Sequence, residues 1–238
     1  AAYFGVPATI IMPSDAPKIK MVNTKALGAK VVLYQRHSED RDAIGRELSK
    51  AHNLTLIPPF NDADIIAGQG TTGLEIAAQA RAMGVEAADV LVCCGGGGLT
   101  SGIALALEAH APGLRARPVE PQGFDDVARS LATGTAQRNS AMSGSICDAI
   151  VTPAPGLMTL PLMQRLCGPG LAVSDDDALR AMALAFSRLK IVVEPGGAVA
   201  LAAALFHPDQ IAGDAVIAVA SGGNVDTDTF TMALARFG

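Results

Sequence analysis

The chain has 238 residues, half of them hydrophobic, with 17% charged residues and a net charge of −5. This predicts a soluble globular protein with enough apolar material for one large domain or two modest ones. Lys and Arg are dispersed, which argues against nucleic acid and against anionic membrane as partners, so a small molecule is the expected partner.

No segment predicts export or membrane insertion. The apolar stretch 197–206 is too short and too rich in Ala to span a bilayer, and the N-terminus has no charged start or cleavage pattern. A cytoplasmic location is therefore expected. The cysteines show no CxxC spacing, which favours free buried thiols over zinc or a disulfide framework.

Runs with a period of 2 alternate with runs with a period of 3.6 along the whole chain. In chain order we expect a strand at 8–12, a helix at 21–27, a strand at 30–34, a helix at 39–51, a strand at 54–57, a helix at 65–83, a strand at 90–92, a helix at 100–110, a strand at 117–119, a helix at 125–131, a helix from 175 to 189, a strand at 215–218 and a helix at 227–237. This alternation predicts an α/β architecture with mainly parallel sheets flanked by helices.

The clearest punctuation is Pro58-Pro59-Phe60-Asn61. Two consecutive prolines interrupt both helix and sheet hydrogen bonding. We therefore predict two lobes: residues 1–57 as the remainder of a small lobe, and residues 58–238 as a large cofactor-binding lobe.

Four consecutive glycines, Gly95, Gly96, Gly97 and Gly98, separate a predicted strand from the helix that follows Leu99. Backbone amides of glycine can turn toward one bound group, and a helix N-terminus adds partial positive charge. The run predicts a cradle for an anion such as a phosphate. A tight turn that binds nothing is the alternative.

Two carboxylates, Glu120 and Asp126, are predicted to lie at a strand end and a helix start, where the Phe124 carbonyl can join them. Hard cations prefer such oxygen ligands, and water would complete the coordination of magnesium. The alternative is a solvated acidic helix N-terminus that favours the helix dipole.

Five motifs in this order resemble one enzyme group: Ala67-Gly68-Gln69-Gly70-Thr71, Gly95-Gly96-Gly97-Gly98-Leu99, Glu120-Pro121 with Asp125-Asp126, Glu194-Pro195-Gly196-Gly197-Ala198, and Ser221-Gly222-Gly223-Asn224-Val225-Asp226. The set is similar to the serine/threonine dehydratase and serine racemase group of fold-type II pyridoxal-phosphate enzymes. Each motif is weak alone, whereas the five together cover nearly the whole chain.

The resemblance implies a two-lobed fold like that of the tryptophan synthase β subunit, with pyridoxal 5'-phosphate as cofactor. It implies that the phosphate binds at Gly95–Gly98 and Leu99, and that Ser221, beside Gly222, bonds the pyridine nitrogen. Glu194 precedes a proline and either faces the cofactor ring or lies on a surface loop. The acidic set Glu120, Phe124 and Asp126 implies a structural or activating divalent cation: Mg, Ca or Mn.

A hydroxyl at the pyridine nitrogen does not hold a proton there as a carboxylate does, so the ring is a weaker electron sink and elimination is favoured. We therefore expect dehydration and deamination of serine, threonine or 3-hydroxyaspartate to a 2-oxo acid and ammonia. The alternatives are an amino-acid racemase of the same family, a nucleotide-binding domain and a non-catalytic binding protein. The expected partners are the amino-acid substrate and, as an open possibility, a second copy in a homodimer.

The segment that carries the Schiff-base lysine in the resembled enzymes, and the Asn-His loop after it, have no counterpart in this sequence. We expect an N-terminal segment of the same protein to supply them, and we expect the 238 residues alone to be inactive. Lys190 is the lysine nearest a motif, but its place at a predicted helix end does not suggest the desolvated pocket that an activated lysine needs.

Overall fold

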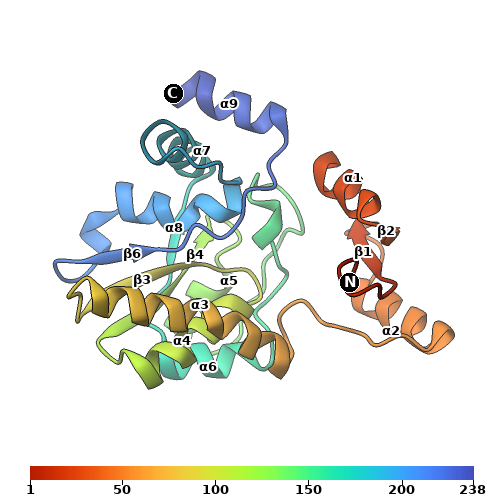
Figure 1. Cartoon of the computed structure of the whole chain (residues 1–238), viewed down its shortest axis with the longest axis horizontal. Helices are drawn as coiled ribbons and strands as arrows, with labels where there is room; N and C mark the ends of the chain where they lie inside the picture. Colours follow the sequence, from red (N-terminus) through yellow and green to blue (C-terminus); the bar gives the residue numbers. More distant parts are fainter. The chain divides into compact units, whose positions relative to one another are not determined.

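The computed structural model describes residues 1–238, which divide into two compact units (Figure 1). The first unit comprises Ala1–Ile57 and Asn224–Thr229, and the second comprises Pro58–Gly223 and Phe230–Gly238. Asn224–Thr229 joins the first unit partly because Asp226 Oδ1 accepts a hydrogen bond from the amide of Ile19 (3.1 Å). The lobe boundaries at 1–57 and 58–238 stay a prediction.

The first unit has two parallel strands, β1 (Thr9–Pro13) and β2 (Lys30–Tyr34), paired from Thr9 with Lys30 to Pro13 with Tyr34. Its helices are α1 (Lys18–Ala26) and α2 (Arg41–His52). The predicted strand at 54–57 is wrong, because this sheet has only β1 and β2 and offers that segment no ladder partner.

The second unit is built on a four-stranded parallel sheet with the order β5-β4-β3-β6. Its elements are α3 (Ala63–Ala82), β3 (Ala88–Cys93), α4 (Gly98–His110), β4 (Leu114–Pro121), α5 (Asp126–Thr133), η1 (Asp148–Ile150), α6 (Thr159–Leu166), β5 (Leu171–Val173), α7 (Asp175–Leu184), η2 (Ala185–Leu189), α8 (Pro195–Phe206), η3 (Pro208–Gln210), β6 (Val216–Ala218) and most of α9 (Thr227–Phe237). The α/β class with parallel sheets is confirmed.

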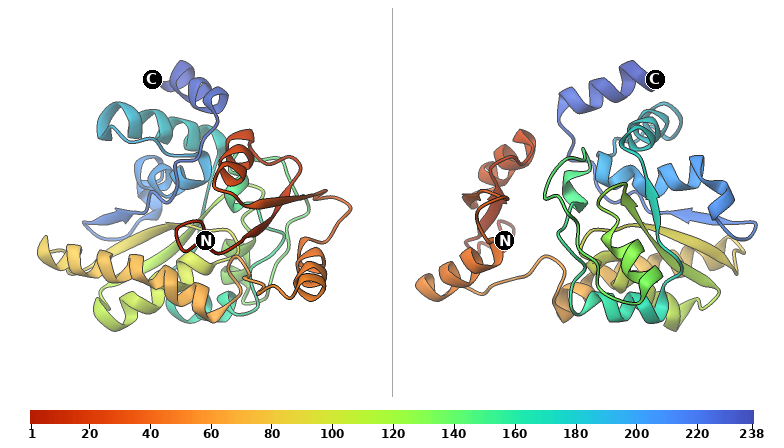
Figure 2. Two further views of the ribbon diagram at one scale, coloured as in Figure 1. Left: turned by 45° about the vertical axis from the view of Figure 1, so that its right-hand side comes forward. Right: turned by 180° about the vertical axis from the view of Figure 1, so that it is seen from behind.

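Helices cover both faces of this sheet. Helices α3, α4 and α6 lie on one face, and α7 and α8 lie on the other (Figures 1 and 2). Every residue of β3 is buried, as expected for a central parallel strand covered on both sides. Val90 and Val92 of β3 share one core cluster with Ile103 and Leu107 of α4.

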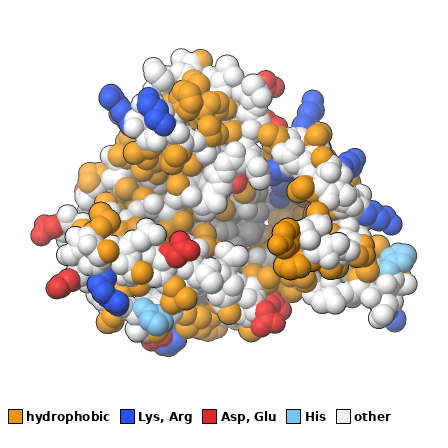
Figure 3. Space-filling model, viewed as in Figure 1, with side chains coloured by type: hydrophobic (Ala, Val, Ile, Leu, Met, Phe, Trp, Pro, Cys, Tyr) orange, Lys and Arg blue, Asp and Glu red, His pale blue; other side chains and the backbone are white.

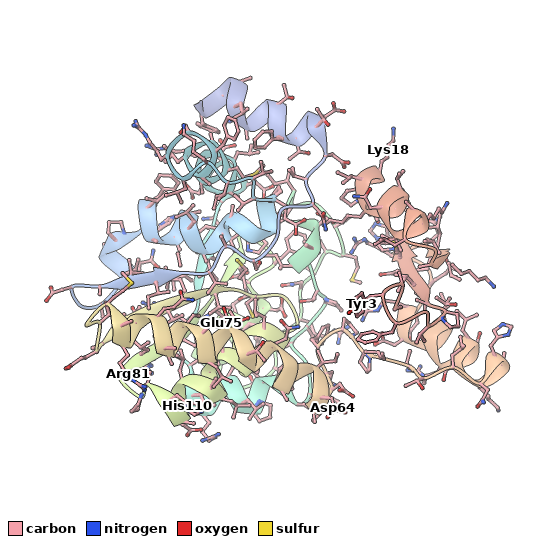
Figure 4. All side chains as sticks on the ribbon, viewed as in Figure 1. Tyr3, Lys18, Asp64, Glu75, Arg81 and His110 are labelled. Atoms are coloured by element: carbon pink, nitrogen blue, oxygen red, sulfur yellow. The ribbon has the colours of Figure 1, made fainter.

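Helices α3 and α4 approach closely because both carry glycine at the contact. A Cβ on Gly73 would lie 2.7 Å from Ala106 Cβ, and one on Gly102 would lie 2.6 Å from the Gly70 nitrogen. At the far end of the pair, Arg81 donates to the His110 carbonyl (3.0 Å), and both residues sit at the same end in Figure 4. Close packing thus accounts for Gly70 and Gly73, which weaken a helix on propensity alone.

The strand order reverses beside β3. The chain passes from β3 through α4 to β4 and then to β5 on one side, and returns through α8 to β6 on the other. In open parallel sheets, ligands bind in the crevice at the carboxyl ends of strands where the order reverses. The fold therefore directs attention to the loops after β3 and β6.

No helix of the structure is both long and apolar enough to cross a bilayer. On the face seen in Figure 3, Lys and Arg side chains are spread over several places, mostly near the edge of the view. All four cysteines, Cys93, Cys94, Cys147 and Cys167, are free and buried, which confirms the prediction from their spacing.

Candidate functional site

The glycine run lies at the reversal point, between the end of β3 and the first turn of α4. Gly97 is the N-cap of α4 in the left-handed conformation (φ 92°), a backbone that side chains rarely adopt. The backbone amides of Gly95, Gly96, Gly97, Gly98 and Leu99 donate no hydrogen bond within the chain. We call these five amides the cradle.

Unbonded amides in a buried loop are costly unless a ligand or water accepts from them. Gly96, Gly97 and Gly98 are buried, and the partial positive charge of the α4 N-terminus acts at the same place. The arrangement thus suits an anionic group with several acceptor oxygens, as the sequence predicts.

The walls around the cradle explain why glycine is needed there. A Cβ on Gly96 would overlap the ring of Phe60, and one on Gly97 would lie 2.5 Å from Met163 Cε and 2.9 Å from Thr159 Oγ1. Phe60 directly follows Pro58 and Pro59, which the sequence analysis interprets only as a boundary between two lobes.

Ser221 follows the neighbouring strand β6 (Val216–Ala218) by three residues. Strand β6 pairs parallel to β3, with Leu91 opposite Ala218, and the Val219 amide donates to the Leu91 carbonyl (3.0 Å). Beyond the end of β6, Ser221 hydrogen-bonds the thiol of Cys93, two residues before the glycine run. Ser221 is exposed, so its hydroxyl is accessible to a ligand.

The Cys93 thiol lies directly under this part of the site. Its Sγ is 3.3 Å from the Val219 carbonyl and 3.4 Å from the Gly197 carbonyl. Burial raises the pKa of the Cys93 thiol, and hydrogen bonds with Ala200 and Ser221 lower it in part. A neutral, buried thiol in this position contributes to packing and is not a nucleophile.

Glu194 also belongs to this corner of the site. It is the N-cap residue of α8, and its amide donates to the Gly222 carbonyl (2.9 Å). A Cβ on Gly222 would overlap Glu194 Oε1, and one on Gly197 would lie 2.6 Å from the Gly222 oxygen. The structure therefore brings Glu194, Gly222 and Ser221 together.

The acidic set lies at the end of β4, the neighbour of β3. Glu120 and Asp126 are fully buried and Phe124 nearly so. Glu120 accepts from the amides of Val127 (3.0 Å) and Ala128 (2.7 Å), so its carboxylate caps the start of α5. The described chain has no group of three His, Cys, Asp or Glu side chains that would hold a metal ion by itself.

Burial changes the acidity of both carboxyls. It raises the pKa of Asp126 to about 6, although a hydrogen bond from Asn139 (2.5 Å) opposes this. Burial, with the nearby charge of Asp126, raises the pKa of Glu120 well above its usual range. Asp126 Oδ2 is buried and has no hydrogen-bond partner.

Comparison with known proteins decides the family. The family model described as "Pyridoxal-phosphate dependent enzyme" matches residues 1–222. The chain belongs to this family. It is 37% identical to the L-threo-3-hydroxyaspartate ammonia-lyase of Saccharomyces cerevisiae over 226 residues, covering 95% of this chain and 68% of that protein. It is 34% identical to the serine racemase of Schizosaccharomyces pombe, covering 99% of this chain and 72% of that protein.

Solved structures of family members share the fold. A threonine deaminase from T.th. has a TM-score of 0.84 and 38% identity, covering 95% of this chain and 71% of that chain. Maize serine racemase has a TM-score of 0.86 and 32% identity, covering 99% and 71%. The predicted fold class, fold-type II, and the resemblance to the dehydratase and racemase group are confirmed.

The residues present fit pyridoxal 5'-phosphate. The cradle offers amides that lack acceptors to the phosphate, and Ser221 offers an exposed hydroxyl next to Cys93, just before the cradle. Lys190 does not fit a role in this site. It is exposed at the end of η2, and its ammonium donates to the Ser187 carbonyl (2.8 Å).

Proposed function

We propose that this family member catalyses the dehydration and deamination of a small β-hydroxy amino acid to a 2-oxo acid and ammonia. Serine, threonine and 3-hydroxyaspartate are the candidate substrates. The observation that carries the proposal is the cradle of five unbonded amides with Ser221 in the loop after the adjacent strand β6. Support for elimination comes from relatives named as ammonia-lyases acting on hydroxyaspartate and threonine.

In this proposal the cradle amides of Gly95–Leu99 hold the cofactor phosphate, and Ser221 bonds the pyridine nitrogen without protonating it. Glu194 and Gly222 fix the Ser221 loop through the bond between the Glu194 amide and the Gly222 carbonyl. Bound pyridoxal phosphate supplies an electron sink for cleavage of the substrate Cα–H bond. A hydroxyl does not hold a proton on the pyridine nitrogen, so the ring stabilises negative charge less well. Elimination is therefore favoured.

Racemisation is the second candidate, because serine racemases of Schizosaccharomyces pombe and Dictyostelium discoideum are 34% identical to the chain. Both reactions begin by removing the same proton, so the site geometry serves either. The family assignment disfavours the nucleotide-binding alternative, since the glycine run then serves the pyridoxal phosphate.

The function is tested with protein expressed from the complete reading frame and loaded with pyridoxal phosphate. L-serine, L-threonine and 3-hydroxyaspartate are supplied separately, and 2-oxo acid, ammonia and the opposite enantiomer are measured. We expect oxo acid and ammonia in equal amounts with at least one substrate. If the opposite enantiomer forms without oxo acid, the protein is a racemase and the lyase proposal is wrong. If no product forms from any substrate, both proposed functions are contradicted.

We further propose that the lysine bound to the cofactor lies outside these 238 residues, because no lysine here lies in a motif like that of the resembled enzymes. Borohydride reduction followed by peptide mapping of the full reading frame tests this. A label outside the 238 residues is expected, together with inactivity of the 238-residue chain alone. A label on Lys190 would contradict the proposal.

We also propose a divalent cation, Mg, Ca or Mn, at Glu120, Asp126 and the Phe124 carbonyl. The unpartnered buried Asp126 Oδ2 fits a cation, which would satisfy it. Because Glu120 and Asp126 are buried near one another and their pKa values are raised, a cation would also stabilise their ionised forms.

This cation predicts a pH-dependent stabilisation. Since the folded-state pKa of Asp126 is raised to about 6, the metal-free protein loses stability as pH rises from about 4 through 6. Mg²⁺ should therefore raise Tm at about pH 7.5 and have little effect at about pH 5. At tenfold excess over Kd the stabilisation is about 1.4 kcal/mol.

The matched variants for this measurement are Asp126→Asn and Asp125→Asn. Asp125 is partly exposed and pairs with Arg129 (3.3 Å), so its loss should leave the Mg²⁺ effect intact. Asp126→Asn should abolish it. An equal Mg²⁺ response in both variants would contradict the site.

For the cellular setting we propose a cytoplasmic enzyme that forms a homodimer. Light scattering of the purified holoenzyme should give twice the monomer mass, and a monomer mass would contradict the dimer.

Fractionation of cells should place the protein with cytoplasmic markers, and recovery in a membrane fraction would contradict that location.

A further inference from the structure

The glycine run cannot orient its own amides. Glycine has no Cβ, so a Gly–Gly peptide rotates between conformations at little cost. An anion site made of such amides therefore needs a group outside the run to fix the peptide planes. The relevant atom is the carbonyl oxygen of Gly96, in the middle of the run.

Two donors hold that carbonyl. Thr159 Oγ1 donates to the Gly96 oxygen at 2.6 Å, and the Gly156 amide donates to it at 3.2 Å. Thr159 Oγ1 is also 3.3 Å from the Gly156 oxygen. A hydroxyl has one proton, and the shorter distance assigns that proton to Gly96.

The peptide plane transmits this restraint to the cradle. In a trans peptide the carbonyl of Gly96 and the amide of Gly97 point in opposite directions. Fixing the Gly96 oxygen toward Thr159 turns the Gly97 amide away from Thr159, and that amide has no acceptor within the chain. The Thr159 hydroxyl thereby sets the direction of a cradle donor without touching the ligand itself.

Thr159 is itself held in place. It is fully buried in the first turn of α6, and its carbonyl accepts from Ser101 Oγ (3.3 Å). Immediately before it, the Met158 amide donates to Asn61 Oδ1 (2.8 Å). A rigid hydroxyl of this kind loses little entropy when it bonds the loop.

We propose that Thr159 is a positioning residue for phosphate recognition, acting by fixing the Gly96–Gly97 peptide. The proposal rests on the proposed function, because it assumes that the cradle binds the phosphate of pyridoxal phosphate. It predicts that loss of the Thr159 hydroxyl weakens binding of the phosphorylated cofactor more than binding of pyridoxal, which lacks the phosphate.

The experiment titrates the apoprotein of the full reading frame with pyridoxal phosphate and with pyridoxal. Thr159→Val keeps the side-chain shape and removes the hydroxyl, and Thr159→Ser keeps the hydroxyl. Loss of one such hydrogen bond should weaken pyridoxal phosphate by about tenfold in Thr159→Val and leave pyridoxal within about twofold. Thr159→Ser should restore the wild-type ratio of the two Kd values.

Ser130→Ala is the matched control, because it removes another fully buried hydroxyl, which donates to the Asp126 carbonyl (2.5 Å) and accepts from the Gln137 amide (2.8 Å) and so bonds neither Thr159 nor the glycine run. It should leave the Kd ratio unchanged. If Thr159→Val does not fold, Thr159→Ala is compared with Thr159→Ser by the same ratio.

Three results would overturn the inference. If the wild type prefers pyridoxal phosphate and Thr159→Val has the same Kd ratio, Thr159 has no positioning role, while the proposed function still stands. An equal loss for both ligands would make Thr159 a structural residue. A wild-type protein with no preference for pyridoxal phosphate would overturn the proposed function as well.

Discussion

Gly97→Ala should both destabilise the protein and abolish tight cofactor binding. The left-handed backbone at Gly97 (φ 92°) costs an L residue about 1–2 kcal/mol. The new Cβ would also meet Met163 Cε at 2.5 Å and Thr159 Oγ1 at 2.9 Å, and overpacking of this kind costs about 1–3 kcal/mol. The end of the flexible Met163 side chain can give way, but Thr159 is fully buried and its Cβ would also lie 3.0 Å away, so we expect relief of the clash to move the loop and with it the cradle amides.

Gly134→Ala separates the two costs. Gly134 has a similar backbone (φ 72°) at the end of α5, but nothing lies within 4 Å of a Cβ there. The free energy of unfolding of Gly134→Ala should fall only by the cost of the left-handed backbone, and this variant should bind pyridoxal phosphate with wild-type affinity. Urea unfolding and cofactor titration measure both quantities. Equal destabilisation of the two variants, or unchanged cofactor affinity in Gly97→Ala, would contradict the packing described for the glycine run.

Replacing Ser221 should change the reaction rather than the fold. Ser221 is exposed, so Ser221→Ala should leave Tm nearly unchanged, while loss of its hydrogen bond lowers kcat/KM for elimination by about tenfold. Ser221→Asp should shift the balance further toward racemisation, because a carboxylate holds a proton on the pyridine nitrogen and strengthens the electron sink.

Ser221→Thr is the matched control for this pair, since it keeps the hydroxyl at an exposed position. Its ratio of oxo acid to enantiomer should stay near that of the wild type. The comparison measures that ratio in the four proteins with one substrate. An unchanged ratio in Ser221→Asp would show that Ser221 does not meet the pyridine nitrogen.

Much of the second unit follows from local sequence patterns. The strand before the glycine run is a short apolar segment followed by residues that favour a turn, and the helix after it has a clear period. These signals predict β3, α4 and the loop between them. Ser174 as an N-cap, with the acidic first turn Asp175–Asp177, likewise predicts the start of α7, where the structure has a capping box, although the last turn, Ala185–Leu189, is a π-helix.

Other elements leave no such signal. Helix α8 is apolar on every side because it is buried all round, so it shows no 3.6-residue period. Strand β5 has only three residues, Leu171–Val173, which is too short for a pattern. The segment at 54–57 shows the reverse case: its composition favours a strand, but the first sheet gives it no neighbour.

Some residues of the candidate site can also be predicted from the sequence, and others cannot. The glycine run, the Ser221 motif and the acidic pair are recognisable as motifs, because the residue types themselves carry the chemistry. Thr159 and Phe60 are not, since a threonine hydroxyl and a phenylalanine ring acquire their roles only through contacts with residues distant in sequence. Their positions depend on tertiary packing, which a single sequence does not encode in any local pattern.

The most direct test is a crystal structure of the protein from the complete reading frame with bound pyridoxal phosphate. The account predicts phosphate oxygens about 2.7–3.2 Å from the amide nitrogens of the Gly95–Leu99 cradle, and Ser221 Oγ at hydrogen-bonding distance from the pyridine nitrogen. A phosphate bound away from the cradle, or a pyridine nitrogen that faces a group other than Ser221, would contradict it.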